Sequence, residues 1–301
     1  MLPGVRILIY QNPDAGHERP RPDTLIETLQ REGHEVEWRN IKEHRLADPD
    51  TGPLDLVVAV GGDGSVGRTA RQLIGGDLPI AVLPMGTANN LANILDAGAH
   101  DLAKRIAAWD LVPFDAGTLE GCGEPDWFFE GLGLGAFADT AARLTKEARS
   151  APPQPSREAE LARDLDELTR TVRGQRPVEV EVSLDGRTIH TGLLLLEILN
   201  ISRLGPGVEL TAGVDPSDGH LDVVLVEESH REQLVAYLEA LKGTSVPPSP
   251  FSALRTTSVR VRAADPVCLH IDGRSEPVRA PVDLKVGIRH HAVRFLGGPA
   301  S

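Results

Sequence analysis

LDLVVAVGGDGS, residues 54–65, is the stretch of this chain that decides the fold. Its first seven residues are almost all apolar, which is typical of a strand buried on both faces of a parallel sheet. The glycines that follow let main-chain N–H groups approach a bound phosphate, and the helix predicted over residues 65–74 adds a favourable dipole at its start. The stretch therefore predicts a strand, a phosphate-binding loop and a helix, with a simple tight glycine turn as the alternative.

A second loop with the same design is PMGTANN, residues 84–90. It follows another short apolar run, residues 80–83, and opens a second predicted helix. Thr87 and Asn89 could donate to phosphate oxygens, or they could only cap that helix. Because both loops follow parallel strands, we expect them at the carboxyl edge of one sheet, where open α/β sheets bind their ligands.

The pattern outside these loops changes near Val112. Before it, strand and helix patterns alternate, which favours a βαβ layout. After it, β-branched runs and turns predominate, interrupted by helices predicted over 157–173 and 230–241. The strands predicted there are 127–129, 178–184, 192–201, 221–226, 258–263, 267–271, 282–286 and 292–296. We therefore predict an α/β nucleotide-binding domain over 1–111 and an antiparallel β-sandwich over 112–301, leaving open whether the last strand returns to the first domain.

Composition excludes several classes of protein. The chain has 301 residues and a net charge of −13, which argues against general nucleic-acid binding. Its two cysteines cannot form a disulfide framework or a four-ligand zinc site, and they fit a cytoplasmic location. The most apolar long run, residues 192–201, is interrupted by Glu197, so we expect no transmembrane segment.

Several motifs together carry a family resemblance. They are Asn-Pro-Asp-Ala-Gly at 12–16, the GGDGS and PMGTANN loops, Asn200, Gly-Pro-Gly at 205–207, DGHLD at 218–222 and Asp272-Gly273. In this order, over nearly the whole chain, they resemble the diacylglycerol kinase catalytic domain family, which includes bacterial lipid kinases and sphingosine and ceramide kinases. The resemblance implies an α/β domain like that of NAD kinases and phosphofructokinases, then a β-sandwich. ATP and Mg²⁺ would be the cofactors, with ATP bound between the domains.

The resemblance also implies roles for single residues. Asp272 matches the family's general base, and Asp63 would be a second catalytic residue. The implied nucleotide-binding residues are Asn12, Gly61, Gly62, Asp63, Gly64, Ser65, Gly86, Thr87 and Asn89. The implied metal ligands are Asp63, Asp115, Asp218 and Asp222. We expect the lipid acyl chains against the second domain.

Some motif positions depart from the family pattern. Gly67-Arg68 stands where relatives usually carry Asn-Glu, Asn90 where they carry Asp, and Arg274 where they carry Glu. Each change removes negative charge from the implied magnesium shell. Arg68 and Arg274 could instead bind phosphate directly, and Glu276 could take the missing Glu role through a two-residue insertion.

These observations predict an ATP- and magnesium-dependent lipid kinase with diacylglycerol as the default acceptor. It would meet its lipid substrate as a peripheral protein at the inner membrane face, and a homodimer is an option. Two alternatives stay open. One is a non-catalytic nucleotide- or lipid-binding relative with a degenerate metal site, and the other is a soluble-substrate kinase resembling NAD kinase.

Overall fold

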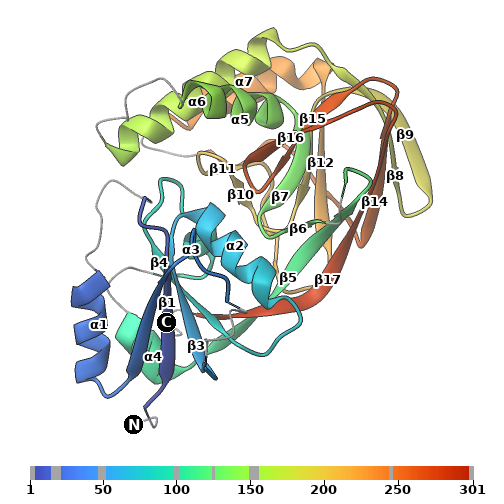
Figure 1. The fold of residues 1–301 in the computed structure, drawn as a ribbon. Coiled ribbons are helices and arrows are strands. Elements are labelled where there is room, and N and C mark those ends of the chain that lie inside the picture. The colour runs from blue at the N-terminus through green and yellow to red at the C-terminus, as the bar shows by residue number, and fades with distance from the viewer. Residues whose placement is uncertain are drawn as a thin grey trace. The chain divides into compact units, whose positions relative to one another are not determined.

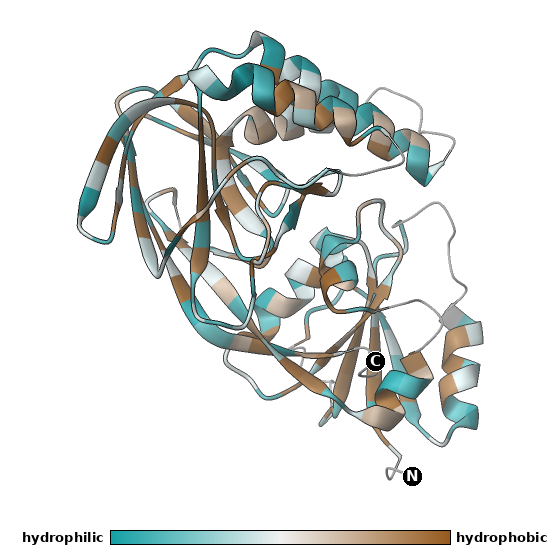
Figure 2. Ribbon diagram, turned by 180° about the vertical axis from the view of Figure 1, so that it is seen from behind, coloured by the Kyte–Doolittle hydropathy of each residue, from teal (hydrophilic) through white to brown (hydrophobic). Residues whose placement is uncertain are grey.

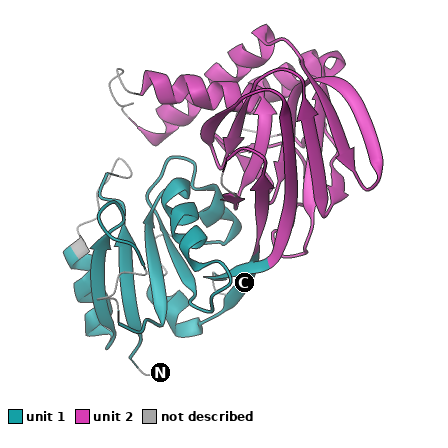
Figure 3. Ribbon diagram, turned by 45° about the vertical axis from the view of Figure 1, so that its right-hand side comes forward, with its two compact units in different colours: residues 1–114, 291–301 teal, residues 115–290 magenta. Residues whose placement is uncertain are grey.

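Two compact units make up the computed structural model of this chain (Figure 1). Unit 1 comprises residues 1–114 and 291–301, and unit 2 comprises residues 115–290 (Figure 3). The structure describes residues 4–14, 22–46, 52–97, 102–123, 126–148, 156–243 and 247–297. Ala15 and Gly16 of the first motif lie outside the described residues.

Unit 1 is built on a parallel sheet. Its strands run in the order β2 (Glu35–Asn40), β1 (Arg6–Gln11), β3 (Leu56–Gly61) and β4 (Ile80–Pro84). The end of β17 (Val282–Leu296) joins beside β4, where Phe295 pairs with Ile80. This confirms the α/β fold class and the buried strand predicted before the GGDGS loop.

Helices cover both faces of this sheet, which is why its central strands are apolar throughout (Figure 2). The helices are α1 (Pro22–Arg31), α2 (Asp63–Leu73), α3 (Asn90–Ile94) and α4 (Leu102–Ala108). Ile7 and Ile9 belong to one apolar cluster with residues of α1 and α4, whereas Leu8 and Tyr10 belong to another. Alternate side chains of β1 therefore pack into two separate apolar cores, one on each face of the sheet.

Unit 2 is mainly antiparallel sheet. Its main sheet runs β16 (Arg274–Val278), β15 (Val267–Ile271), β7 (Gly131–Gly135), β9 (Arg187–Leu199), β8 (Val178–Leu184), β14 (Ser258–Ala263) and β17. Further strands are β12 (Leu221–Glu227) on β9, β13 (Leu254–Thr256) on β12, and β6 (Asp126–Phe128) on β5 (Leu111–Glu120), which also pairs with β17. A separate small ribbon joins β10 (Arg203–Leu204) and β11 (Val208–Glu209).

Unit 2 has two apolar cores. One lies among the strands, and the other includes residues of β9, β12 and the helices. The helices are α5 (Ala136–Glu147), α6 (Arg157–Gly174) and α7 (Arg231–Ala240), the last preceded by a 3₁₀ turn at Glu228–His230; they lie together on one side of the unit (Figure 1). No described helix is both long enough and apolar enough to cross a membrane.

Several parts of the fold differ from the sequence prediction. Residues 282–286 and 292–296 belong to one continuous strand, β17, so the predicted break between them is wrong. The polar residues Arg289 to His291 look like a turn in sequence, but they lie in a strand that pairs with β14 before them and with β4 after them. The short helix α4 and the helix α5 were not predicted.

Arg105 fastens the end of β17 to unit 1. Its side chain is almost fully buried, and it donates to the main-chain carbonyls of Val82, Leu296 and Gly297 at 2.9, 2.6 and 3.1 Å. Each carbonyl would lose this donor if the guanidinium were removed, and a buried unpaired acceptor costs free energy.

We expect Arg105→Met, which keeps the side-chain length, to lower the free energy of unfolding by roughly 3 kcal/mol because the donated hydrogen bonds are lost. Urea denaturation measures this. Lys104→Met, at an exposed neighbour, is the control and should change stability by less than about 0.5 kcal/mol. Equal effects of the two changes would contradict the fastening role.

Candidate functional site

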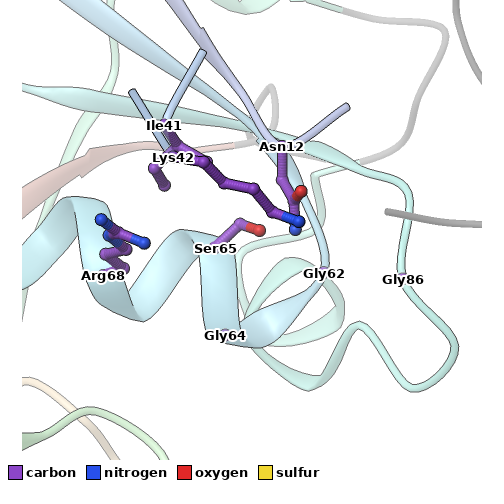
Figure 4. Close-up of a pocket in the computed structure, with 8 residues that line it drawn as sticks. All are labelled: Asn12, Ile41, Lys42, Gly62, Gly64, Ser65, Arg68 and Gly86. Atoms are coloured by element: carbon purple, nitrogen blue, oxygen red, sulfur yellow. The ribbon is translucent and has the colours of Figure 1, made fainter. Parts of the chain in front are cut away.

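A pocket lies in unit 1 at the carboxyl edge of the parallel sheet (Figure 4). Its volume is about 320 Å³, and its lining residues are Asn12, Ile41, Lys42, Gly62, Gly64, Ser65, Arg68 and Gly86. They come from the ends of β1 and β2, from the GGDGS loop with α2, and from the PMGTANN loop. The sheet therefore brings the two predicted glycine loops together.

Gly62 and Gly86 are the point at which the two loops touch. A Cβ atom added at residue 86 would lie 2.4 Å from the Gly62 Cα, and one added at residue 62 would lie 2.9 Å from the Gly86 Cα. Because both distances are shorter than real Cβ contacts, neither position accepts a side chain without moving backbone. The glycines are needed for close packing of the loops as well as for access to the pocket.

Asp63 connects the same two loops through hydrogen bonds to main-chain amides. Its Oδ1 accepts from the N–H of Leu91 in α3 at 3.0 Å. Burial raises the pKa of Asp63, opposed by hydrogen bonds from the amides of Leu91, Asn90 and Asn89. Asp63 is not among the residues that line the pocket. Its carboxylate therefore holds the start of α3 beside α2.

Asn89 shapes the second loop. Its side-chain amide donates to the carbonyl of Gly86, and its Oδ1 accepts from the Gly86 N–H, both at 2.8 Å. Asn89 has a positive φ of 54°, a conformation that asparagine tolerates better than most residues. Thr87 is partly buried in the same loop. The structure thus favours a loop-forming role for Asn89.

Two cations lie at the pocket. Lys42 follows β2 and pairs with Asp14, and Figure 4 shows its side chain extending past Asn12 and Ser65. Arg68 lies three residues after Ser65 on α2, so both side chains are on one face of that helix. Lys42 belongs to no glycine motif, so the motifs do not point to it; its place just after a parallel strand is the sequence signal that could have found it.

Asp272, the predicted base, lies in unit 2 at the turn between β15 and β16. Its carboxylate accepts from the main-chain N–H groups of Phe129, Glu130 and Gly131, with N–O distances of 2.8 to 3.3 Å. Such bonds are strongest when the carboxylate is ionised. We call these amides, residues 129–131, the amide cradle.

Asn200 holds the same segment from its other side. Its side-chain amide donates to the carbonyls of Phe129 at 2.9 Å and Asp115 at 3.1 Å. The Asp115 side chain is fully buried, and its oxygens contact the Gly219 N–H at 2.7 Å and His290 Nδ1 at 3.0 Å. Asp115, Asn200 and the amide cradle are thus linked by hydrogen bonds.

The predicted metal ligands of unit 2 have protein partners. Asp218 accepts from the His220 N–H at 2.9 Å and pairs with Arg255. Arg255 is directly opposite Asp222 in the β12–β13 register. Burial raises the pKa of Asp222, and the positive charge of the neighbouring Arg255 only partly offsets this rise. The guanidinium of Arg255 therefore supplies positive charge beside both carboxylates.

The described lining of the unit 1 pocket does not by itself build a magnesium site. Mg²⁺ usually takes one or two protein carboxylates together with substrate phosphates and water. Among described residues, the pocket lining offers cations, amides and a hydroxyl but no carboxylate, and Asp63 is occupied with the amides of α3. A metal ion at this pocket would therefore have to be carried by the phosphates of its ligand.

Arg274 and Glu276 lie in β16. Arg274 pairs with Asp126 of β6, and Glu276 is opposite Leu269 in the register with β15. Burial, with Glu276 and Asp126 nearby, raises the pKa of the Cys122 thiol. The phosphate-binding role suggested for Arg274 and the role of the missing Glu suggested for Glu276 stay predictions.

Comparisons with known proteins match both units. Residues 6–119 match the diacylglycerol kinase catalytic domain, and residues 156–296 match the YegS C-terminal NAD kinase beta sandwich-like domain. The chain is 23% identical to a diacylglycerol kinase of Bacillus subtilis (strain 168) over 290 residues, 89% of each chain. It is 26% identical to a probable lipid kinase YegS-like of Stenotrophomonas maltophilia (strain K279a) over 269 residues, 81% of this chain and 80% of the relative.

A solved structure has the same fold. The crystal structure of a putative diacylglycerol kinase from Bacillus anthracis str. Sterne superposes with a TM-score of 0.75 at 17% identity, covering 98% of this chain and 96% of that one. This likeness supports the predicted order of an α/β domain followed by a β-sandwich-like domain.

The Asp63 contacts lead to a prediction. We expect Asp63→Ala to lower the free energy of unfolding by about 1 kcal/mol, because the start of α3 loses its acceptor. ATP affinity should fall with it, because the Gly86 loop is no longer held against Gly62. Asp63→Asn keeps an acceptor oxygen and should retain more of both properties. Urea denaturation and ATP titration measure the two effects.

The pH dependence of the free energy of unfolding separates the effect of the Asp63 charge from that of its hydrogen bonds. A raised folded pKa means that ionised Asp63 is less favourable in the folded than in the unfolded chain. Relative to Asp63→Asn, the wild-type protein should therefore lose stability as pH rises through the folded pKa, and should regain it towards acid pH. A difference that does not vary with pH would contradict this.

Proposed function

Because this chain belongs to the diacylglycerol kinase catalytic domain family, we propose that it is an ATP-dependent lipid kinase that phosphorylates a lipid hydroxyl. We take diacylglycerol as the expected acceptor, since relatives from Bacillus subtilis and Mycobacterium tuberculosis carry the name diacylglycerol kinase. The acceptor lies in a membrane, so the kinase would meet it at a membrane surface.

The pocket of unit 1 is the observation that carries the proposal. Its glycine loops end at a helix start, which suits a phosphate group. Lys42 and Arg68 add two positive charges at the same cavity. A guanidinium binds phosphate through paired hydrogen bonds, and a lysine binds it as a point charge. We infer that the phosphates of ATP occupy this pocket.

Asp272 is the proposed base for the acceptor. As the lipid oxygen forms its bond to the γ-phosphorus, the bond from that phosphorus to ADP breaks, and Asp272 takes the hydroxyl proton. The amide cradle fixes the carboxylate, and fixed geometry is what phosphoryl transfer needs from a protein. We expect Mg²⁺ to be required, and expect it to enter with the triphosphate.

The test is transfer of labelled γ-phosphate from ATP to detergent-solubilised lipids, with NAD as a soluble control acceptor. We expect a phosphorylated lipid, with diacylglycerol as the best acceptor, and no phosphorylated NAD. Asp272→Asn should lower kcat by roughly 100-fold or more and leave ATP affinity unchanged, because only the base is removed. Phosphorylated NAD without phosphorylated lipid would contradict the proposal.

Lys42 and Arg68 give a second prediction. We expect Lys42→Ala and Arg68→Ala each to raise the KM for ATP roughly 10-fold or more, the effect of one lost charged hydrogen bond. Arg68→Glu, which restores the residue usual in relatives, should raise the KM further because it places a carboxylate beside the phosphates. Arg31→Ala, an exposed arginine outside this pocket, is the control. An unchanged KM in Arg68→Glu would remove Arg68 from the site.

A nucleotide-binding protein without transfer activity is the second candidate. The observation that favours it is the described pocket lining, which offers no carboxylate to a metal ion. ATP binding without transfer to any acceptor would select this candidate.

A further inference from the structure

A buried acid–base pair spans three neighbouring strands of unit 2. Glu197 lies in β9, and His270 lies in β15. Gly133 of β7 is opposite both residues in the strand register. His270 Nε2 and Glu197 Oε2 are 2.6 Å apart, and the side chains are 3% and 0% exposed.

Gly133 makes this contact possible. A Cβ atom added there would lie 2.3 Å from Glu197 Oε2, so a side chain on the middle strand would displace the carboxylate. The side chains of Glu197 and His270 therefore meet over Gly133, the position on the middle strand that has no side chain. The arrangement depends on all three strands keeping their register.

The surroundings of the pair are mostly apolar. The ring of Phe137 in α5 lies 6.1 Å from the His270 ring, and Leu195 and Leu199 share the Glu197 face of β9. Burial raises the pKa of Glu197. Burial also lowers the pKa of His270, but the facing Glu197 carboxylate, with a smaller contribution from Asp272, raises it overall.

Stability does not explain such a pair. Replacing a buried ion pair by apolar side chains of similar size is often neutral or stabilising, because two charged groups must be taken out of water. Polar groups of this kind are better known for specifying one register among several. The question is which register this pair specifies.

The register matters for Asp272, which lies in the turn just after the end of β15. Asp272 follows His270 and Ile271 directly, and the amide cradle that holds Asp272 leads into β7. The pair therefore links β15 to β9 across β7, and the cradle links the turn after β15 to the start of β7. A shift of β15 along β7 would break both at once.

We propose that Glu197 and His270 are positioning residues that fix β15 against β7 and thereby keep the Asp272 carboxylate in its amide cradle. The proposal rests on the proposed function, in which Asp272 is the base. It adds two residues, Glu197 and His270, that no motif of the chain identified. They act through Asp272 and do not touch the reacting atoms.

The test replaces both side chains, with Glu197→Leu and His270→Leu in one protein. We expect the melting temperature to stay equal or rise, kcat to fall roughly 10- to 100-fold as expected for a displaced group, and the KM for ATP to stay unchanged. Hydrogen exchange of the amides of residues 129–131 should accelerate, because their acceptor is less firmly held. Hydrogen exchange can be measured whether or not the protein transfers phosphate.

Two further variants complete the experiment. Glu197→Gln, as a single substitution, keeps a hydrogen bond to His270. It should retain most of the wild-type kcat and most of the amide protection at residues 129–131. Leu269→Val lies on the opposite face of β15 and loses only apolar contacts. It should lower the melting temperature without changing kcat or exchange at residues 129–131. If the double variant fails to fold, Glu197→Asp, whose shorter side chain breaks the 2.6 Å contact, should show the same lowered kcat and faster exchange.

A stable double variant with wild-type kcat and wild-type exchange at residues 129–131 would overturn the proposal. Failure of the proposed function looks different. In that case the wild-type protein would transfer no phosphate to lipid, or Asp272→Asn would keep its activity, while the double variant would still exchange faster at the cradle.

Discussion

The hydrogen bond from the Leu91 amide to the Asp63 carboxylate is the contact on which the proposed nucleotide site depends. It holds the start of α3 beside α2 and so brings the PMGTANN loop against the GGDGS loop. Gly62 and Gly86 then meet with no room for a Cβ atom. The pocket that Lys42 and Arg68 border exists because these two loops are joined.

Unit 2 uses the same kind of contact for Asp272. In both units an aspartate that sequence motifs suggest for chemistry is bound by main-chain amides. Amides are fixed by the strands and helices that carry them, so the position of each carboxylate follows from the fold. The position of the Asp272 carboxylate thus depends on the register of β7, β9 and β15. We propose that Glu197 and His270 maintain this register.

Local patterns in the sequence predicted most of the fold. Apolar runs predicted β3 and β4, and the glycine loops after them predicted the pocket edge. The α/β and sandwich order is confirmed by both family matches. The sequence predicted two strands in place of β17 because the polar residues in its middle resemble a turn. The structure shows one strand whose two ends belong to different units.

The site was harder to predict because its contacts join distant residues. The sequence suggested Asp63 as a ligand and Asn89 as either a phosphate donor or a helix cap, and the structure shows hydrogen bonds of both side chains that build the loops. Lys42 is in no glycine motif. Glu197 and His270 become partners only through two strand pairings, and Gly133 matters because it leaves space. Gly135 has a φ of 88°, and a Cβ atom added there would lie 2.2 Å from the Leu194 carbonyl oxygen, so this position also accepts no side chain.

A single-turnover experiment tests the central claim most directly: one unit binds the phosphates and the other supplies the base. Enzyme in excess over labelled ATP is mixed with diacylglycerol and quenched at short times, for the wild-type protein, Arg68→Ala and Asp272→Asn. We predict that Arg68→Ala recovers wild-type transfer at saturating enzyme, whereas Asp272→Asn binds ATP but forms labelled lipid roughly 100-fold or more slowly at every enzyme concentration. Normal transfer by Asp272→Asn, or failure of Arg68→Ala at saturation, would contradict the account.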